Sequence, residues 1–86
     1  LVVLSEVGYY WSRDALQTAK IRISGALEPG GHLLLVHWTP FVHDYPMTGD
    51  QVHEAFLDPG DGLPLRHLGG RRTDHYRLDL LERDAD

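Results

Sequence analysis

The chain has 86 residues, which suffice for one small domain. Its net charge of −5 at pH 7 argues against a nucleic-acid partner, because affinity for a phosphate backbone comes from clustered positive charge. The chain has no cysteine, which excludes disulfides and thiolate chemistry, and no apolar run near the roughly 20 residues that cross a bilayer. We therefore expect a cytoplasmic protein with no membrane partner.

A buried strand is predicted over residues 1–7, where Val2, Val3 and Val7 are β-branched. The chain starts inside this apolar run and without an initiator Met. Since a buried strand needs neighbours on both sides, we expect that an N-terminal part precedes these residues. A loop is predicted over residues 8–11.

A helix is predicted over residues 13–27, with Ser12 as its N-cap and Asp14 in its first turn, where the helix dipole favours negative charge. Apolar residues recur at spacings of three and four and form one stripe, which consists of Leu16, Ala19, Ile23 and Leu27. The polar residues expected on the other side are Gln17, Lys20 and Ser24.

The most informative stretch is a second predicted strand over residues 32–38. A Pro-Gly-Gly turn at residues 29–31 precedes it, and an apolar run over residues 33–36 stops at His37 and Trp38. A continuous apolar run between turn signals is typical of a strand that is buried on both faces of a parallel sheet.

The two predicted strands end in side chains that can carry chemistry. Ser5 and Glu6 close the first strand, and His37 and Trp38 close the second. Open α/β sheets bind ligands beyond the carboxyl ends of their strands. Because neighbouring strands lie roughly 4.8 Å apart, we expect Glu6 and His37 to face one small cleft.

A second helix is predicted over residues 49–57. Thr48 and Gln51 form a capping-box pattern at its start, and Val52 and Phe56 mark its buried face.

Two further strands are predicted over residues 63–70 and 75–83. In the last one we expect a buried face and a polar face, formed respectively by Tyr76, Leu78 and Leu80 and by Arg77 and Asp79. The order strand, helix, strand, helix, strand, strand predicts an α/β fold that combines a right-handed βαβ unit with an antiparallel edge hairpin.

This order resembles the C-terminal half of a class I S-adenosylmethionine-dependent methyltransferase. Residues 1–7 (LVVLSEV) resemble the fourth strand of that family, and residues 27–35 (LEPGGHLLL) resemble the entry to its fifth strand. Residues 37–38, 44–46 and 48–53 further resemble the nodulation-protein-S-type enzymes, which resemble N-methyltransferases of an amino sugar.

The resemblance implies a partial Rossmann-like sheet in which residues 1–86 form the C-terminal half of a methyltransferase domain. It also implies S-adenosylmethionine as the cofactor. The family's glycine-rich loop and acidic ribose-binding residue have no counterpart in this sequence, which contains no Gly-x-Gly-x-x-Gly pattern. We therefore expect little cofactor affinity or activity from these residues alone.

The resemblance places cofactor contacts at Ser5, Glu6 and Val7. Glu6 and His37 are the catalytic candidates. A carboxylate can bind a substrate amine or accept its proton, and a neutral imidazole near pH 7 can take a proton from an amine or orient a substrate hydroxyl. Each has a structural alternative. Glu6 can cap the turn that follows it, and His37 can be a hydrogen-bonded histidine of the interior.

Five residues are predicted to contact a small-molecule substrate: Tyr9, Tyr10, Trp38, His43 and Tyr45. Aromatic faces attract a cation such as a sulfonium, although packing of the loop against the helix is the alternative for the tyrosines. A competing metal site would use His37, His43 and His53, whose spacing matches no zinc pattern.

The leading hypothesis is methyl transfer to a small-molecule nucleophile, with an amine on a sugar as the acceptor and this chain as the substrate-side half of the enzyme. The alternative is a non-catalytic interaction module derived from the same fold. In either case an unpaired strand edge would permit self-association.

Overall fold

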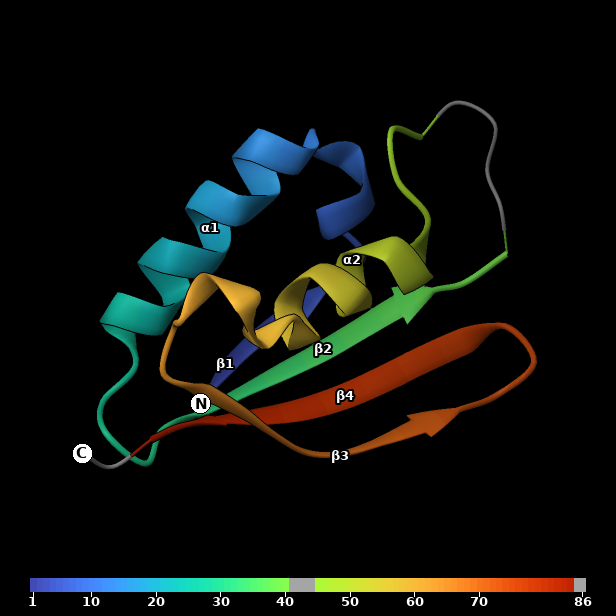
Figure 1. The fold of residues 1–86 in the computed structure, drawn as a ribbon. Coiled ribbons are helices and arrows are strands. Elements are labelled where there is room, and N and C mark those ends of the chain that lie inside the picture. Colours follow the sequence, from blue (N-terminus) through green and yellow to red (C-terminus); the bar gives the residue numbers. More distant parts are fainter. Residues whose placement is uncertain (41–44, 85–86) are drawn as a thin grey trace.

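A computed structural model of the chain describes residues 1–40 and 45–84. Its regular elements are, in chain order, β1 (Val2–Ser5), the short 3-10 helix η1 (Gly8–Tyr10), α1 (Arg13–Ala26), β2 (His32–Trp38), α2 (Gly49–Leu57), the short 3-10 helix η2 (Pro59–Asp61), β3 (Leu65–Arg72) and β4 (Tyr76–Arg83). Both α-helices lie on the same side of one sheet (Figure 1). None of the described helices is long and apolar enough to cross a membrane.

The sheet has four strands in the order β1-β2-β4-β3. β1 is parallel to β2, and β4 is antiparallel to both of its neighbours. The last strand of the chain is therefore inserted between β2 and β3, which leaves β1 and β3 at the edges. This arrangement confirms the predicted α/β class, with parallel strands and an antiparallel hairpin.

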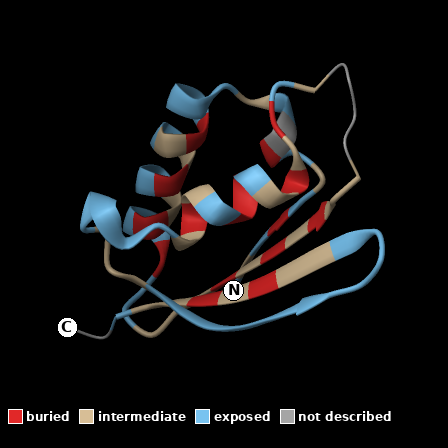
Figure 2. Ribbon diagram, turned by 45° about the vertical axis from the view of Figure 1, so that its right-hand side comes forward, coloured by how far each residue is buried: buried red, intermediate tan, exposed pale blue. Residues whose placement is uncertain are grey.

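The helices bury one face of the sheet. In β2 the buried residues alternate with half-buried ones, so that Leu33 and Leu35 are fully buried while Leu34 and Val36 are not. Figure 2 shows the buried residues of α1 and α2 on the sides that face the sheet. The prediction that β2 is buried on both faces is therefore wrong for the described part of the chain.

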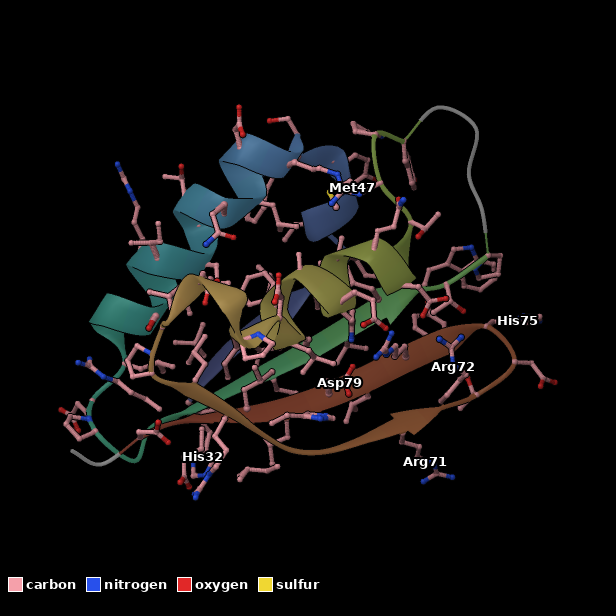
Figure 3. The ribbon with its side chains drawn as sticks, in the orientation of Figure 1. His32, Met47, Arg71, Arg72, His75 and Asp79 are labelled. Carbon is pink, nitrogen blue, oxygen red and sulfur yellow. The ribbon has the colours of Figure 1, made fainter. Side chains whose placement is uncertain are left out.

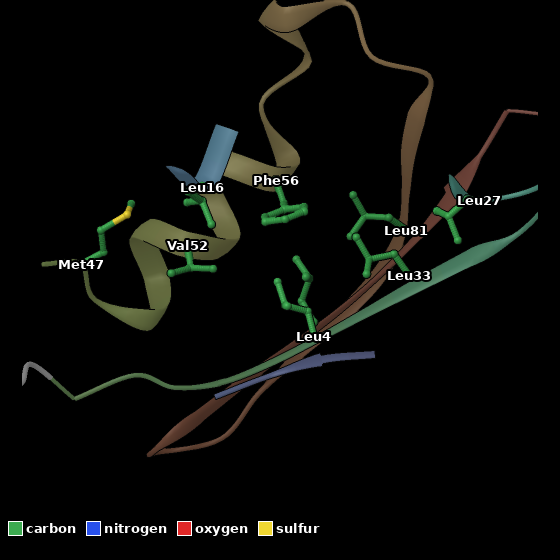
Figure 4. Close-up of a cluster of buried hydrophobic side chains, with 9 residues drawn as sticks. Leu4, Leu16, Leu27, Leu33, Met47, Val52, Phe56 and Leu81 are labelled. Atoms are coloured by element: carbon green, nitrogen blue, oxygen red, sulfur yellow. The ribbon is translucent and has the colours of Figure 1, made fainter. Parts of the chain in front are cut away.

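The core lies between the helices and the covered face of the sheet. It consists of Leu4, Leu16, Leu27, Leu33, Leu35, Met47, Val52, Phe56 and Leu81. In the close-up, strand residues Leu4, Leu33 and Leu81 approach Phe56 of α2 (Figure 4). Removing most of a buried side chain such as Phe56 typically costs about 3–5 kcal/mol, so this cluster is a main source of stability.

The uncovered face of the sheet is also apolar. Val3 pairs with Leu34, and Leu34 pairs with Leu80 on the other side, so the three side chains form one row across three strands. Val36 and Leu78 form a second pair beside them. We call these five residues the open apolar face.

Helix α1 begins where it was predicted, because the Ser12 side chain accepts a hydrogen bond from the backbone N–H of Ala15 (3.2 Å). Its buried stripe differs from the expected one: Lys20 and Ser24 are buried, with exposed fractions of 1% and 2%. The prediction that these two residues face solvent is wrong, because the stripe that begins at Leu16 continues through them.

Lys20 is buried because it caps the end of α2. Its ammonium group donates to the carbonyl oxygens of Ala55 and Asp58 (both 3.0 Å) and forms an ion pair with Asp61 (2.5 Å). Carbonyls at a helix end lack partners within the helix, so a cation there is favourable. Partial desolvation opposes the charge of Asp61, but hydrogen bonds, led by that from Lys20, lower its pKa to about 2.

The capping box that starts α2 is present as predicted, and the bounds of β2 and α2 agree with the prediction. The buried face of β4 differs from the predicted one. Leu81 pairs with Leu33 and Asp79 pairs with Leu35, so these residues share the helix-covered face. Because paired residues point to the same side of a sheet, the polar face predicted for this strand is the one that turns inward.

Candidate functional site

The carboxyl ends of β1 and β2 meet at one edge of the sheet. Ser5 pairs with Val36, and the N–H of Glu6 donates to the carbonyl of Val36 (3.1 Å). Glu6 has a φ of 63°, a left-handed conformation that is uncommon outside glycine. Residues held in such conformations cluster at functional sites.

The Glu6 side chain connects the two strand ends. Its carboxylate accepts a hydrogen bond from the backbone N–H of Trp38 (3.1 Å), the last residue of β2. The residue is nevertheless half-buried rather than enclosed. Glu6 therefore places a carboxylate at the predicted position, where it caps the end of the neighbouring strand.

The turn after Glu6 is packed tightly against α2. Gly8 is buried, and a Cβ added to it would lie 2.5 Å from a methyl group of Val52 and 3.1 Å from Nε2 of His37. Only glycine fits this position without displacing a neighbour. The turn η1 is therefore held at a fixed distance from the core.

The predicted substrate contacts fall into separate groups. The hydroxyl groups of Tyr10 and Tyr45 are 3.0 Å apart and their rings meet edge to face, with centroids 4.7 Å apart. Trp38 instead contacts His75 and Tyr76, at centroid distances of 5.2 and 5.4 Å. His43 and the side chain of Tyr9 lie outside the described parts of the chain, and the substrate roles of all five residues stay predictions.

His37 is fully buried on the helix-covered side of the sheet. Its Nε2 accepts a hydrogen bond from the N–H of Gly8 (3.1 Å), and its Nδ1 lies 3.0 Å from Nε2 of His53. Burial, and secondarily the neighbouring His53, lower the pKa of His37 to about 4, so the ring is neutral at pH 7.

The expectation that His37 and Glu6 face one open cleft is therefore wrong. His37 points beneath α2, and both of its ring nitrogens have partners within the protein. Proton transfer to a substrate requires a ring nitrogen within reach of that substrate. The geometry favours the structural alternative, in which His37 holds the backbone around it.

Sequence reasoning missed the buried pair of His53 and Asp79, because it considered His53 only as a metal ligand and placed Asp79 on a polar face. They lie 2.6 Å apart, and their exposed fractions are 0% and 3%. His53 was visible as a candidate core residue, because it precedes Phe56 by three positions on the same helix face. The inward position of Asp79 depends on the strand register, which has no signal in the sequence.

The metal alternative gains no support from the geometry. The described residues contain no group of three or more His, Cys, Asp or Glu side chains that could hold a metal ion. His37 and His53 are hydrogen-bonded to one another, and His43, the third proposed ligand, lies outside the described residues.

A solved structure supports the fold. The crystal structure of a protein from Pseudomonas syringae, described as a "putative Methyltransferase", matches 94% of this chain with a TM-score of 0.71 and 27% sequence identity. The chain spans 45% of that protein. No protein-family model and no curated protein matches the sequence. The chain thus has a methyltransferase-like fold, and its mixed sheet is the one that the sequence predicted.

Proposed function

We propose that this chain forms the substrate-side half of an S-adenosylmethionine-dependent methyltransferase that acts on a small-molecule nucleophile. The observation that carries this function is the match to the Pseudomonas syringae protein over 94% of the chain. The chain spans 45% of that protein, and the sequence resemblance would make residues 1–86 the C-terminal half of the domain. An amine on a sugar is the acceptor class that the nodulation-protein-S resemblance favours.

The residues at the sheet edge fit one end of the cofactor. When bound, S-adenosylmethionine supplies a methyl group on a sulfonium, which is already activated for transfer. Ser5 and Val7 are exposed and Glu6 is half-buried beside them, so this segment can contact a ligand. A carboxylate and nearby aromatic rings suit a positively charged sulfonium.

Glu6 would bind and orient the acceptor amine. Its hydrogen bond to Trp38 anchors the carboxylate, while its left-handed backbone sets the direction of the chain at the edge. As the nitrogen–carbon bond forms and the carbon–sulfur bond breaks, the amine loses a proton, which Glu6 or solvent accepts. Most of the rate enhancement would come from alignment of the reactants, because a sulfonium needs little acid–base assistance.

Transfer of a labelled methyl group tests this function. In the natural full-length protein, a panel of small amines that includes amino sugars should contain an acceptor. Glu6→Gln should lower turnover roughly 10- to 1000-fold. Glu82→Gln is the matched control, because Glu82 pairs with Arg66 and His32 at the far end of β4 and should leave turnover unchanged. Equal rates in the two variants would remove Glu6 from the reaction.

A second candidate function is favoured by a separate observation. β1 is an edge strand, and Val3 on the open apolar face is 53% exposed. Edges of this kind pair with other chains, and contiguous exposed apolar surface marks interaction sites. As an interaction module, the protein would associate through β1 and transfer no methyl group to any amine of the panel.

A further inference from the structure

A chain of three hydrogen bonds crosses the interior from η1 to β4. The N–H of Gly8 bonds Nε2 of His37 (3.1 Å), Nδ1 of His37 bonds Nε2 of His53 (3.0 Å), and Nδ1 of His53 bonds Asp79 (2.6 Å). The two imidazole rings are perpendicular, with centroids 5.1 Å apart. All three side chains are buried, so these bonds are shielded from bulk solvent.

The protons along these three hydrogen bonds have one consistent arrangement. A backbone N–H can only donate, so Nε2 of His37 must be without a proton, and the proton of the neutral ring is on Nδ1. That proton points at Nε2 of His53, which must accept it. The proton of His53 is therefore on Nδ1, where the Asp79 carboxylate accepts it.

Asp79, at the outer end of this series of hydrogen bonds, is held in place by charged neighbours. Asp79 forms an ion pair with Nε of Arg77 (2.9 Å), and its second oxygen bonds Nε2 of His67 (2.9 Å). Arg77 also pairs with Asp50 and Glu54 on α2. Figure 3 labels Asp79 on β4 beneath α2.

The ion pairs around Asp79 and Arg77 extend to the protein surface. A hollow of about 300 Å³ is lined by Glu54, Gly70, Arg71, Arg72, Arg77 and Asp79. The Asp79 carboxylate, which accepts the proton of His53, is therefore itself oriented by ion pairs at the surface.

Gly8, at the other end of this series of hydrogen bonds, lies next to the candidate site. Gly8 starts the turn η1 and follows Glu6 by two positions, and Tyr10 in the same turn contacts Tyr45. The hydrogen bond to His37 is thus the polar contact that fixes the first N–H of this turn. If His37 carried its proton on Nε2, two donors would face one another and the bond would be lost.

We propose that His37, His53 and Asp79 form a tautomer lock for the turn at the end of β1. Asp79 orients His53, His53 keeps the proton of His37 on Nδ1, and His37 then holds the N–H of Gly8. In the methyltransferase proposed above, on which this part of the inference rests, His53 and Asp79 are positioning residues that act on the substrate site through Gly8. The same logic governs the serine-protease triad, where a buried Asp sets the tautomer of its His.

Nitrogen NMR of the intact protein with ¹⁵N-labelled histidine tests the lock without any substitution. Coupling patterns of ring protons to ring nitrogens distinguish the two neutral tautomers. We expect His37 and His53 both to carry the proton on Nδ1. A wild-type spectrum with the proton of either ring on Nε2 would overturn the inference.

Two substitutions of His53 separate the lock from simple packing. His53→Gln keeps an acceptor for His37 and a donor for Asp79, whereas His53→Leu fills similar space with neither. In His53→Leu the hydrogen exchange of the Gly8 amide should accelerate roughly tenfold, the effect of losing one hydrogen bond, while His53→Gln should stay near wild type. Equal exchange in both variants would contradict the lock; if His53→Leu does not fold, the wild-type tautomers and the His53→Gln exchange rate decide.

The methyl-transfer assay adds a readout that depends on the proposed function. His53→Leu should lower kcat about tenfold or more with little change in KM, because a displaced turn misaligns the reactants, and His53→Gln should restore it. Absence of methyl transfer in the wild-type protein would reject the proposed function and leave the NMR and exchange results to judge the lock. Locked tautomers with unchanged kcat in His53→Leu would restrict the lock to folding and refute its positioning role.

Discussion

The two faces of the sheet differ in the polar groups that they carry. The face covered by helices carries His37 and Asp79 among its leucines, and His53 of α2 packs against them; all three side chains are buried. The uncovered face carries five valine and leucine side chains, of which Val3 is 53% exposed. A buried polar group is tolerated only when its hydrogen bonds are satisfied, and among the described residues no buried side-chain N or O atom lacks a partner.

Burial alone therefore does not locate the chemistry of this protein. Under the helices, His37, His53 and Asp79 orient one another through hydrogen bonds, and His37 holds the turn η1 beside the candidate site. The open apolar face consists only of valine and leucine side chains, which form no hydrogen bonds. Each face therefore predicts a different response to substitution.

The largest expected difference concerns two adjacent leucines of β2. Leu33→Ala on the covered face should lower the free energy of unfolding by about 3 kcal/mol, since it leaves a cavity in a packed core. Leu34→Ala on the open apolar face should cost about 1 kcal/mol or less, because that side chain is only half-buried. Urea unfolding of both variants measures the difference. Equal losses would show that the open apolar face is covered in solution.

The buried histidines predict a dependence of stability on pH. The pKa of His37 is about 4 in the folded protein and 6.5 in the unfolded chain, and burial also lowers the pKa of His53. Between these values the unfolded chain binds more protons, so the free energy of unfolding rises with pH and reaches its full value above about pH 6.5. The contribution of His37 alone is about 3 kcal/mol, which is lost as the pH falls toward 4.

Replacement of His37 checks the source of this slope. His37→Gln should flatten the rise of stability between pH 4 and 6.5, whatever its effect on stability at neutral pH. His32→Gln serves as the control, because the His32 side chain is 42% exposed. A slope in His37→Gln as steep as that of the wild type would show that His37 is not buried in its neutral form.

Gly8→Ala tests the contact between η1 and α2. The added methyl group would lie 2.5 Å from Val52, so we expect a loss of about 2 kcal/mol in the free energy of unfolding. Gly69→Ala is the control, because no atom lies within 4 Å of its added Cβ. Combining Gly8→Ala with Val52→Ala should recover part of the overpacking cost, and a fully additive pair would show that the two sites do not touch.

The smallest expected change in stability is on the open apolar face. Val3→Lys should alter the free energy of unfolding by roughly 0.5 kcal/mol, but the charge should weaken association through β1. Sedimentation velocity over a range of concentrations would show a shift toward the monomer. Ile21→Lys, at a 51% exposed position on α1, should leave association unchanged. A wild-type protein that is monomeric at every concentration would refute self-association.

Local signals in the sequence were sufficient for the elements themselves. Ser12 and Thr48 cap their helices as predicted, and the Pro-Gly-Gly turn leads into β2. The end of β1 was predicted two residues too late, because the left-handed backbone of Glu6 stops the strand after Ser5. Caps, turns and spacing act within a few residues, so they can be recognised without knowledge of the rest of the fold.

Local signals thus suffice for the order of strands and helices and for the place of Glu6 at a strand end. Which side of each element is covered depends on tertiary packing. Alternation in β4 distinguishes two faces, but the face of Asp79 became the inner one because β4 pairs with β2 in a register that aligns Asp79 with Leu35. The joining of His37, His53 and Asp79 likewise depends on three segments far apart in the chain, whose contacts exist only once α2 packs on the sheet.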